Sequence, residues 1–225
     1  MADSQLNWPI GSLRGCNPWV TFKELGGVLM VVNIHPQEIF GNWKSGIALD
    51  FHTTSSTPIG YNESGYMQFD TVRPEIAELL YQLKYHAKEE AAQGIAVAAA
   101  TFLQPHKEKI DLIIPVPPST ERAVQPVIVL ANRIGTAVSL PVVPCIATTR
   151  ATTQLKGVTD PVKRKELVAG LYAVDPQYTA GKNVLLFDDL FRSGTTLGAI
   201  TDVLLKAGKA ASVRVLTITK TRSNQ

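Results

Sequence analysis

Two adjacent carboxylates, Asp188 and Asp189, directly follow the apolar run Val184–Phe187 and precede a turn of small polar residues, 193–196. Backbone N–H groups at a helix N-terminus, with serine and threonine hydroxyls beside them, hold a phosphate without any cation. Two carboxylates just before such a turn can accept hydrogen bonds from two neighbouring hydroxyls. The spacing therefore predicts a site for a ligand that has a phosphate at one end and a vicinal diol at the other, as in a ribose 5-phosphate.

The flanking elements place these residues at one edge of a sheet. The apolar run has the length of a buried strand, and Leu197, Ile200 and Leu204 recur after the turn at helical spacing. In open α/β sheets, ligands bind at the carboxyl ends of strands. A plain strand–turn–helix unit whose Asp pair caps the helix is the alternative. Two acids followed at this distance by Gly-Thr-Thr make that alternative the weaker one.

Other phosphate and metal motifs are missing from the sequence. It contains no G-x-x-x-x-G-K-[ST] P-loop, and no G-x-G-x-x-G follows a strand. The four histidines lack metal-ligand spacing, and we expect each to be a surface residue rather than a ligand: His35, His52, His86 and His106.

Composition bounds the class of protein. A chain of 225 residues with 45% hydrophobic residues can form one α/β domain with an appendage, or two small domains. The net charge of +3 suits a small anionic ligand but is too weak and dispersed to favour nucleic acid. Apolar runs fall short of the ~20 residues that a membrane helix needs. Two distant cysteines and an N-terminus without a signal-peptide pattern favour the cytoplasm.

Strand and helix signals alternate from about residue 108, as a parallel α/β fold requires. A strongly helical segment, Pro74–Leu103, precedes them, and Gly94 is a candidate break within it. A helix is expected over 127–134, stopped by Gly135. About five core strands are expected, at 110–116, 141–145, 171–174, 184–187 and 211–218. Residues 73–225 are therefore predicted to be an α/β core with a mainly parallel sheet flanked by helices.

Residues 1–72 have a different character. Segments 28–34 and 46–51 indicate strands, and Glu63–Gly65 indicates a turn between extended segments. We expect this region to be a small β-rich N-terminal hood or lid over the site.

Residues 184–196 resemble the signature of type I phosphoribosyltransferases, which implies that fold for residues 73–225. In that family the two acids bind the 2- and 3-hydroxyls of phosphoribosyl pyrophosphate (PRPP), and the loop binds its 5-phosphate. By this resemblance, Asp188 and Asp189 hold the ribose. Mg²⁺ is expected to arrive with PRPP, with no direct protein ligand and with a water bridge to one of the two acids as an option. The phosphate loop would consist of Phe191, Arg192, Ser193, Gly194, Thr195 and Thr196.

The resemblance also implies residues for the pyrophosphate. The loop after the strand at 110–116 offers Ser119, Thr120 and Arg122, although a Pro-terminated strand before a capped helix is the alternative reading. The polar segment 148–170 matches the flexible loop that covers PRPP in the family. Within it, Arg150 and Lys156 are the residues expected to take part in catalysis beside the two acids.

The chain is further similar to the ComF-like branch of these enzymes. The similarity spans about residues 75–220 and rests on Leu83-Lys84-Tyr85, Ile114-Pro115-Val116-Pro117 and the segment 150–155. The paired CxxC zinc module that is usual at the N-terminus of that branch is absent, and residues 1–72 stand in its place.

The implied function is transfer of ribose 5-phosphate from PRPP to a small nitrogen acceptor, with release of pyrophosphate. Oxopurine-salvage members carry an Asp three residues after the second acid, whereas this chain has Arg192, which cannot act as a base. No N-terminal cysteine is present to release ammonia from glutamine. The alternative is a non-catalytic PRPP- or nucleotide-binding protein, either regulatory or accessory to DNA uptake. A homodimer is left open.

Overall fold

A five-stranded sheet forms the centre of the protein in a computed structural model that describes residues 19–21, 31–118, 125–150 and 160–222. Its strand order is β3-β4-β11-β10-β7. The four strands β4, β11, β10 and β7 are parallel, and the edge strand β3 is antiparallel to β4. The bounds are β3 Gln37–Glu38, β4 Ser45–Phe51, β7 Leu112–Pro115, β10 Asn183–Phe191 and β11 Ser212–Lys220.

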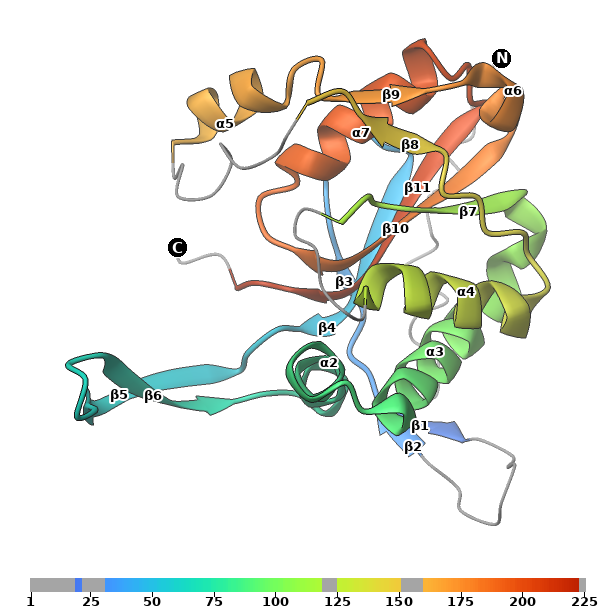
Figure 1. Cartoon of the computed structure of the whole chain (residues 1–225). Helices are drawn as coiled ribbons and strands as arrows, with labels where there is room; N and C mark the ends of the chain where they lie inside the picture. Colours follow the sequence, from blue (N-terminus) through green and yellow to red (C-terminus); the bar gives the residue numbers. More distant parts are fainter. Residues whose placement is uncertain (1–18, 22–30, 119–124, 151–159, 223–225) are drawn as a thin grey trace.

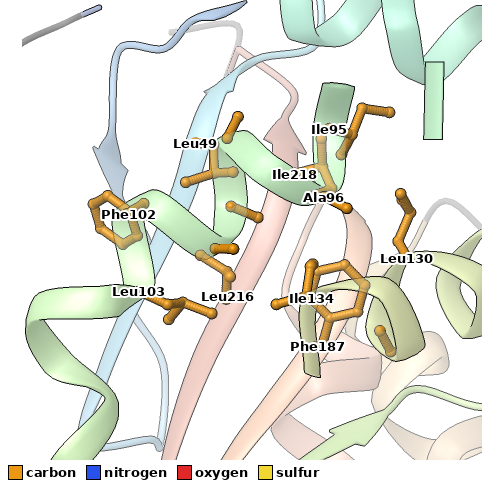
Figure 2. Close-up of a cluster of buried hydrophobic side chains, with 14 of the residues drawn as sticks. Leu49, Ile95, Ala96, Phe102, Leu103, Leu130, Ile134, Phe187, Leu216 and Ile218 are labelled. Atoms are coloured by element: carbon orange, nitrogen blue, oxygen red, sulfur yellow. The ribbon is translucent and has the colours of Figure 1, made fainter. Parts of the chain in front are cut away.

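Helices cover both faces of this sheet (Figure 1). The helices α2 (Glu75–His86), α3 (Glu89–Leu103) and α4 (Pro126–Val138) lie on one face, and α7 (Thr195–Lys206) lies on the other. Figure 2 shows the first of these interfaces, where strand residues such as Phe187 and Leu216 pack against side chains of α3 and α4. The many alanines of α3 are buried, which lets its backbone lie close to its neighbours.

The predicted helical segment 74–103 is confirmed, but it breaks at another residue than expected. Ala87, not Gly94, separates α2 from α3, and its φ of 50° is left-handed. Gly94 lies buried inside α3. The helix α4 likewise continues through Gly135 to Val138. A Cβ at Gly135 would lie 2.4 Å from Val142 Cγ2 and 2.8 Å from the Leu140 carbonyl oxygen, so this glycine serves close packing and does not end the helix.

Shorter elements complete the described part of the chain. The strands β8 (Ile146–Thr148) and β9 (Tyr172–Val174) pair antiparallel beside α7, and α5 (Pro161–Val168) connects toward them. The 3-10 helix η1 (Gln104–Lys109) and α6 (Pro176–Thr179) are connectors. The expected strand at 141–145 is wrong, because only Val142 bridges to Ile113 and the strand begins at Ile146. Within 148–170, residues 161–168 are helical.

The N-terminal region is not the separate unit that the sequence suggests. The predicted strand at 46–51 is real, but as β4 it lies beside β11 within the main sheet. Ile47 and Leu49 are fully buried against the helices, and Ala48 is buried on the other face. A strand that is buried on both faces belongs inside a parallel sheet, because a strand at an edge or in a lid would have one face exposed to solvent.

The remaining N-terminal strands lie outside the main sheet. β1 (Trp19–Thr21) pairs with β2 (Val31–Asn33), and β5 (Ser55–Tyr61) pairs with β6 (Met67–Val72). The turn expected at Glu63–Gly65 joins β5 and β6, and this hairpin extends away from the body of the protein (Figure 1). A lid role for residues 1–72 stays a prediction. Among the described helices, none has the length and apolar character needed to cross a membrane.

Candidate functional site

The two adjacent acids lie inside β10 and not after it. Pairing with β11 continues from Asp188, opposite Thr217, to Phe191, opposite Lys220. Side chains alternate across a strand, so neighbouring residues point to opposite faces of the sheet. Leu185 and Phe187 pack with α2–α4, whereas Val184 and Leu186 pack with α7. Asp189 therefore lies on the α2 face, and Asp188 lies on the α7 face.

Asp189 forms an ion pair with a lysine of α2. Lys84 Nζ lies 2.9 Å from Asp189 Oδ2, and the two side chains are only 14% and 15% exposed. Lys84 belongs to the Leu-Lys-Tyr segment, whose middle residue was not given a role from the sequence. The ion pair places a cation directly beside the Asp189 carboxyl.

Asp188 is in the opposite electrostatic situation. Burial, together with the negative charge of Asp189, raises the pKa of the Asp188 carboxyl from 3.8 to about 8. The Asp189 N–H donates to Asp188 Oδ1 at 2.8 Å and works against this shift, as does the more distant charge of Lys84. At neutral pH, Asp188 can thus donate a hydrogen bond.

The turn after β10 has the geometry of an anion site. Gly194 has a left-handed φ of 72° and precedes the first residue of α7, Thr195. The hydroxyls of Ser193 and Thr195 lie 3.0 Å apart, and both Arg192 and Ser193 are exposed. The first N–H groups of a helix have no partner within it. Backbone donors and two hydroxyls are thus brought together just beyond the acids, and the exposed Arg192 adjoins them in the chain.

Two residues of the N-terminal region support this turn. The Trp43 ring meets the Phe191 ring edge-on, with centroids 6.3 Å apart. A Cβ on Gly194 would lie 3.0 Å from the Phe191 ring and 3.3 Å from the Trp43 ring. Asn42 Nδ2 donates to the Gly198 carbonyl in α7 at 2.9 Å. Neither Asn42 nor Trp43 was singled out from the sequence as part of the site, because no local spacing links them to residues 188–196.

His52 is not the simple surface residue that the sequence suggests. It follows β4 and is partly buried, with Nδ1 lying 3.1 Å from Thr219 Oγ1. Thr219 Oγ1 donates in turn to the Asp189 carbonyl at 3.3 Å. Burial and the positive charges of Lys84, Arg73 and Arg192 lower the pKa of His52, and the charge of Asp189 opposes them.

The residues predicted for the pyrophosphate are described only in part. Arg150 donates from Nη2 to the carbonyls of Leu167 and Ala169, at 2.9 and 3.1 Å, near the C-terminal end of α5. Its guanidinium therefore donates hydrogen bonds to backbone carbonyls and is not paired with the acids of β10. The other four predicted residues lie outside the described part of the chain: Ser119, Thr120, Arg122 and Lys156.

A sequence model described as phosphoribosyl transferase domain matches residues 82–225. Among curated proteins, none matches the chain.

Three solved structures show what the chain resembles in three dimensions. The adenine phosphoribosyltransferase of Saccharomyces cerevisiae is 16% identical, with 74% of this chain and 82% of that one covered and a TM-score of 0.42. The adenine phosphoribosyl transferase of Trypanosoma brucei is 15% identical, with 83% and 75% covered and a TM-score of 0.44. UMP synthase of Leishmania donovani is 18% identical, with 71% and 28% covered and a TM-score of 0.37.

Proposed function

We propose that this chain, which belongs to the phosphoribosyl transferase domain family, binds PRPP and transfers its ribose 5-phosphate to a nitrogen acceptor, releasing pyrophosphate. The observation that carries the proposal is the succession of Asp188, Asp189 and the left-handed Gly194 at the point where β10 turns into α7. This succession puts diol-binding acids and a phosphate-binding helix start at the carboxyl edge of a parallel sheet, where ligands of α/β folds bind.

The ribose and its 5-phosphate have separate places in this proposal. The phosphate lies on the backbone of Arg192–Thr196, where helix N–H groups and hydroxyls donate to it. The two ribose hydroxyls meet acids of unequal charge: Asp189, paired with Lys84, accepts a hydrogen bond, and protonated Asp188 donates one.

The pyrophosphate end is assigned to residues that the resemblance implies. We assign it to Ser119, Thr120 and Arg122 after β7, and to Arg150 and Lys156. We propose that Mg²⁺ comes with PRPP. The hard carboxylate oxygens at 188 and 189 suit Mg²⁺ in its outer shell. When bound, it neutralises charge on the leaving pyrophosphate.

The protein contributes to this reaction mainly by positioning the ribose. Breaking the bond between C1 and pyrophosphate leaves an oxocarbenium-like ribose, as in other glycosyl transfers. The acids and the phosphate turn fix the sugar at two points, so that C1 keeps one orientation toward an incoming nitrogen. Residues 148–170 are proposed to keep water away from C1.

A cytoplasmic location of the protein is proposed as well.

We also propose that the chain lies near the ComF-like branch. Lys84, the middle residue of the Leu-Lys-Tyr segment of that branch, touches the second acid, which supplies a physical reason for a lysine there.

A second candidate function is non-catalytic binding of PRPP or a nucleotide, in a regulatory or DNA-uptake role. It is favoured by Arg150, whose guanidinium is held by carbonyls of the α5 region and not directed to β10. Release of pyrophosphate from PRPP separates the two functions, because a sensor binds PRPP without consuming it.

The proposed function is tested by comparing two ligands in the variant Asp188→Asn/Asp189→Asn. Losing the hydrogen bond to the charged Asp189 costs about 1.5–3 kcal/mol, so PRPP should bind at least 10-fold more weakly. Inorganic phosphate, which contacts only the turn, should bind within twofold of wild type. Titration calorimetry measures both ligands. Asp202→Asn, an exposed acid on α7, is the matched control. Equal weakening of both ligands would show that the acids are only structural.

A further inference from the structure

The Trp43 ring occupies a slot that three glycines of three different segments leave open. Gly41 lies between β3 and β4, Gly46 lies on β4, and Gly194 belongs to the phosphate turn, residues 192–196. A Cβ on Gly41 would lie 2.3 Å from Trp43 Cη2, and one on Gly46 would lie 2.5 Å from Trp43 Nε1. A Cβ on Gly194 would lie 3.3 Å from Trp43 Cη2. The missing side chains therefore make room for the indole, which is only 8% exposed.

The indole is anchored to the main sheet. Trp43 Nε1–H donates to the Ile39 carbonyl at 3.0 Å, and the Ile39 N–H donates to the Gly46 carbonyl of β4 at 3.0 Å. The N–H of the next residue, Lys44, donates to the Val213 carbonyl of β11 at 2.8 Å. Because these bonds tie the residue to β4 and β11, the sheet holds the ring in place independently of the turn that the ring contacts.

The same segment contacts the chain on both sides of Gly194. Before it, the ring of Phe191 at the end of β10 meets the Trp43 ring edge-on, with centroids 6.3 Å apart. After it, the carbonyl of Gly198 in α7 accepts a hydrogen bond of 2.9 Å from Asn42 Nδ2. Asn42 and Trp43 thus brace the turn before and after its left-handed glycine.

Such a brace affects anion binding because glycine leaves the left-handed conformation easily. Glycine populates positive and negative φ about equally, so an unsupported turn also samples conformations in which its N–H groups do not converge. The apparent Kd of a ligand rises as the fraction of molecules in the binding conformation falls. Contacts that keep Gly194 at a φ of 72° therefore increase the affinity of the turn without touching the ligand.

We propose that Trp43 and Asn42 are positioning residues for the phosphate: they hold the turn 192–196 in its anion-binding conformation before the ligand arrives. The inference rests on the proposed function for the place of the phosphate. Both residues lie outside 82–225, the part of the chain that the family model matches, so the N-terminal region supplies part of the support for the site. Coupling between two sites is reciprocal. Phosphate on the turn should therefore stabilise the segment 39–44 by the factor that this segment gives to phosphate binding.

The brace is tested by the affinities of Trp43 variants for two ligands. In titration calorimetry, we expect Trp43→Leu to weaken inorganic phosphate and PRPP with Mg²⁺ by the same factor, about 10-fold or more, because both ligands use the turn. Trp43→Phe keeps an aromatic ring and should restore both affinities to within about threefold of wild type. Asn42→Ala removes one hydrogen bond of an exposed side chain and should weaken both ligands about threefold.

Leu204→Ala is the matched control. Leu204 is fully buried in the same hydrophobic cluster as Trp43, but it lies near the other end of α7. Its loss costs packing and stability without changing the support of the turn, so both affinities should stay within about twofold of wild type. A role of Trp43 in stability alone would instead make the two variants alike.

The reciprocal effect is tested in the wild-type protein by hydrogen exchange. Saturating phosphate should slow exchange of the Ile39 and Lys44 amides and of the Trp43 indole N–H about 10-fold, the factor that Trp43→Leu loses in affinity. The amide of Thr54, which donates to the Val72 carbonyl at the base of the β5–β6 hairpin, is the control and should not change.

Three results would overturn the inference. They are a wild-type phosphate affinity in folded Trp43→Leu, weakening of PRPP alone in that variant, and exchange at Ile39 and Lys44 that phosphate leaves unchanged. If circular dichroism shows that Trp43→Leu does not fold, Asn42→Ala and the exchange measurement decide. If neither phosphate nor PRPP binds the wild-type protein, it is the proposed function that falls, so the two failures are distinguishable.

Discussion

Lys84 on α2 forms an ion pair with Asp189 on β10, the second acid of the site, with 2.9 Å between Nζ and Oδ2. Burial and the negative charge of Asp189 raise the pKa of the neighbouring Asp188 to about 8. Two identical side chains, one residue apart, thus have different surroundings because β10 points them to different faces.

The ion pair should contribute to stability. Lys84→Met leaves the Asp189 carboxylate without its cation in a mostly buried position, and we expect the free energy of unfolding to fall by about 2 kcal/mol. The double variant Lys84→Met/Asp189→Asn should lose less than the sum of the single variants, with a coupling of about 1 kcal/mol. Urea denaturation measures all three. Lys206→Met, which breaks an exposed pair with Asp202, should cost below about 0.5 kcal/mol. Additive losses would show that the pair contributes nothing.

Asp188 should make stability depend on pH. With a pKa raised from 3.8 to about 8, the folded protein holds a proton that the unfolded chain has already lost between those values. Its contribution to stability is therefore complete below about pH 4 and is lost as the pH rises through about 8. We expect the free energy of unfolding of wild type, relative to Asp188→Asn, to fall between pH 5 and 8, by at most about 1.4 kcal/mol per pH unit. Parallel curves for the two proteins would mean that Asp188 is ionised in the native state.

Gly194 should be required for binding of PRPP and phosphate because a side chain at this position would contact the Phe191 ring, in addition to straining the backbone. Gly194→Ala puts a side chain at a φ of 72°, which costs about 1–2 kcal/mol, and brings its Cβ to 3.0 Å from the Phe191 ring. Gly181 offers a matched control, because its φ of 70° is nearly the same and a Cβ there meets open space. Both variants should lose similar backbone stability, but only Gly194→Ala should weaken PRPP and phosphate binding, by at least 10-fold in calorimetry. Equal affinities in the two variants would show that the phosphate does not bind at this turn.

Most of the α/β core was predictable because strong local patterns encode it. Apolar runs of strand length gave β7, β10 and β11, helical periodicity gave α2, α3 and α7, and the family match confirms the fold class. The place of β4 was not predictable in this way. Its run of residues 46–51 indicates a strand, but no local signal says that it pairs with β11, more than 160 residues later. Pairing over such distances depends on the whole packed core.

The site was predictable where its residues are contiguous and hidden where they are not. Residues 188–196 carry acids, glycine and hydroxyls in one stretch, so the sequence shows them together. Lys84, His52 and Trp43 reach the same edge from α2, from the end of β4 and from the segment before it. The Leu-Lys-Tyr segment marks Lys84 without giving it a role, and the other two look ordinary in their own neighbourhoods. The extension of β10 through both acids also escaped the sequence, because aspartates have low strand propensity and only the ladder with β11 keeps them extended.

Arg150 should have two roles that separate in experiment. In the free protein its guanidinium holds the carbonyls of Leu167 and Ala169, so Arg150→Met should speed amide hydrogen exchange over 161–168 about fivefold, the effect of losing about 1 kcal/mol. If Arg150 also helps pyrophosphate to leave, the variant should bind PRPP with Mg²⁺ about 10-fold more weakly and inorganic phosphate unchanged. PRPP with Mg²⁺ should then slow exchange within 148–170 in wild type but much less in the variant. Lys163→Met, an exposed residue of α5, is the control. Faster exchange with an unchanged PRPP affinity would make Arg150 scaffold alone and would favour a non-catalytic binder over a transferase.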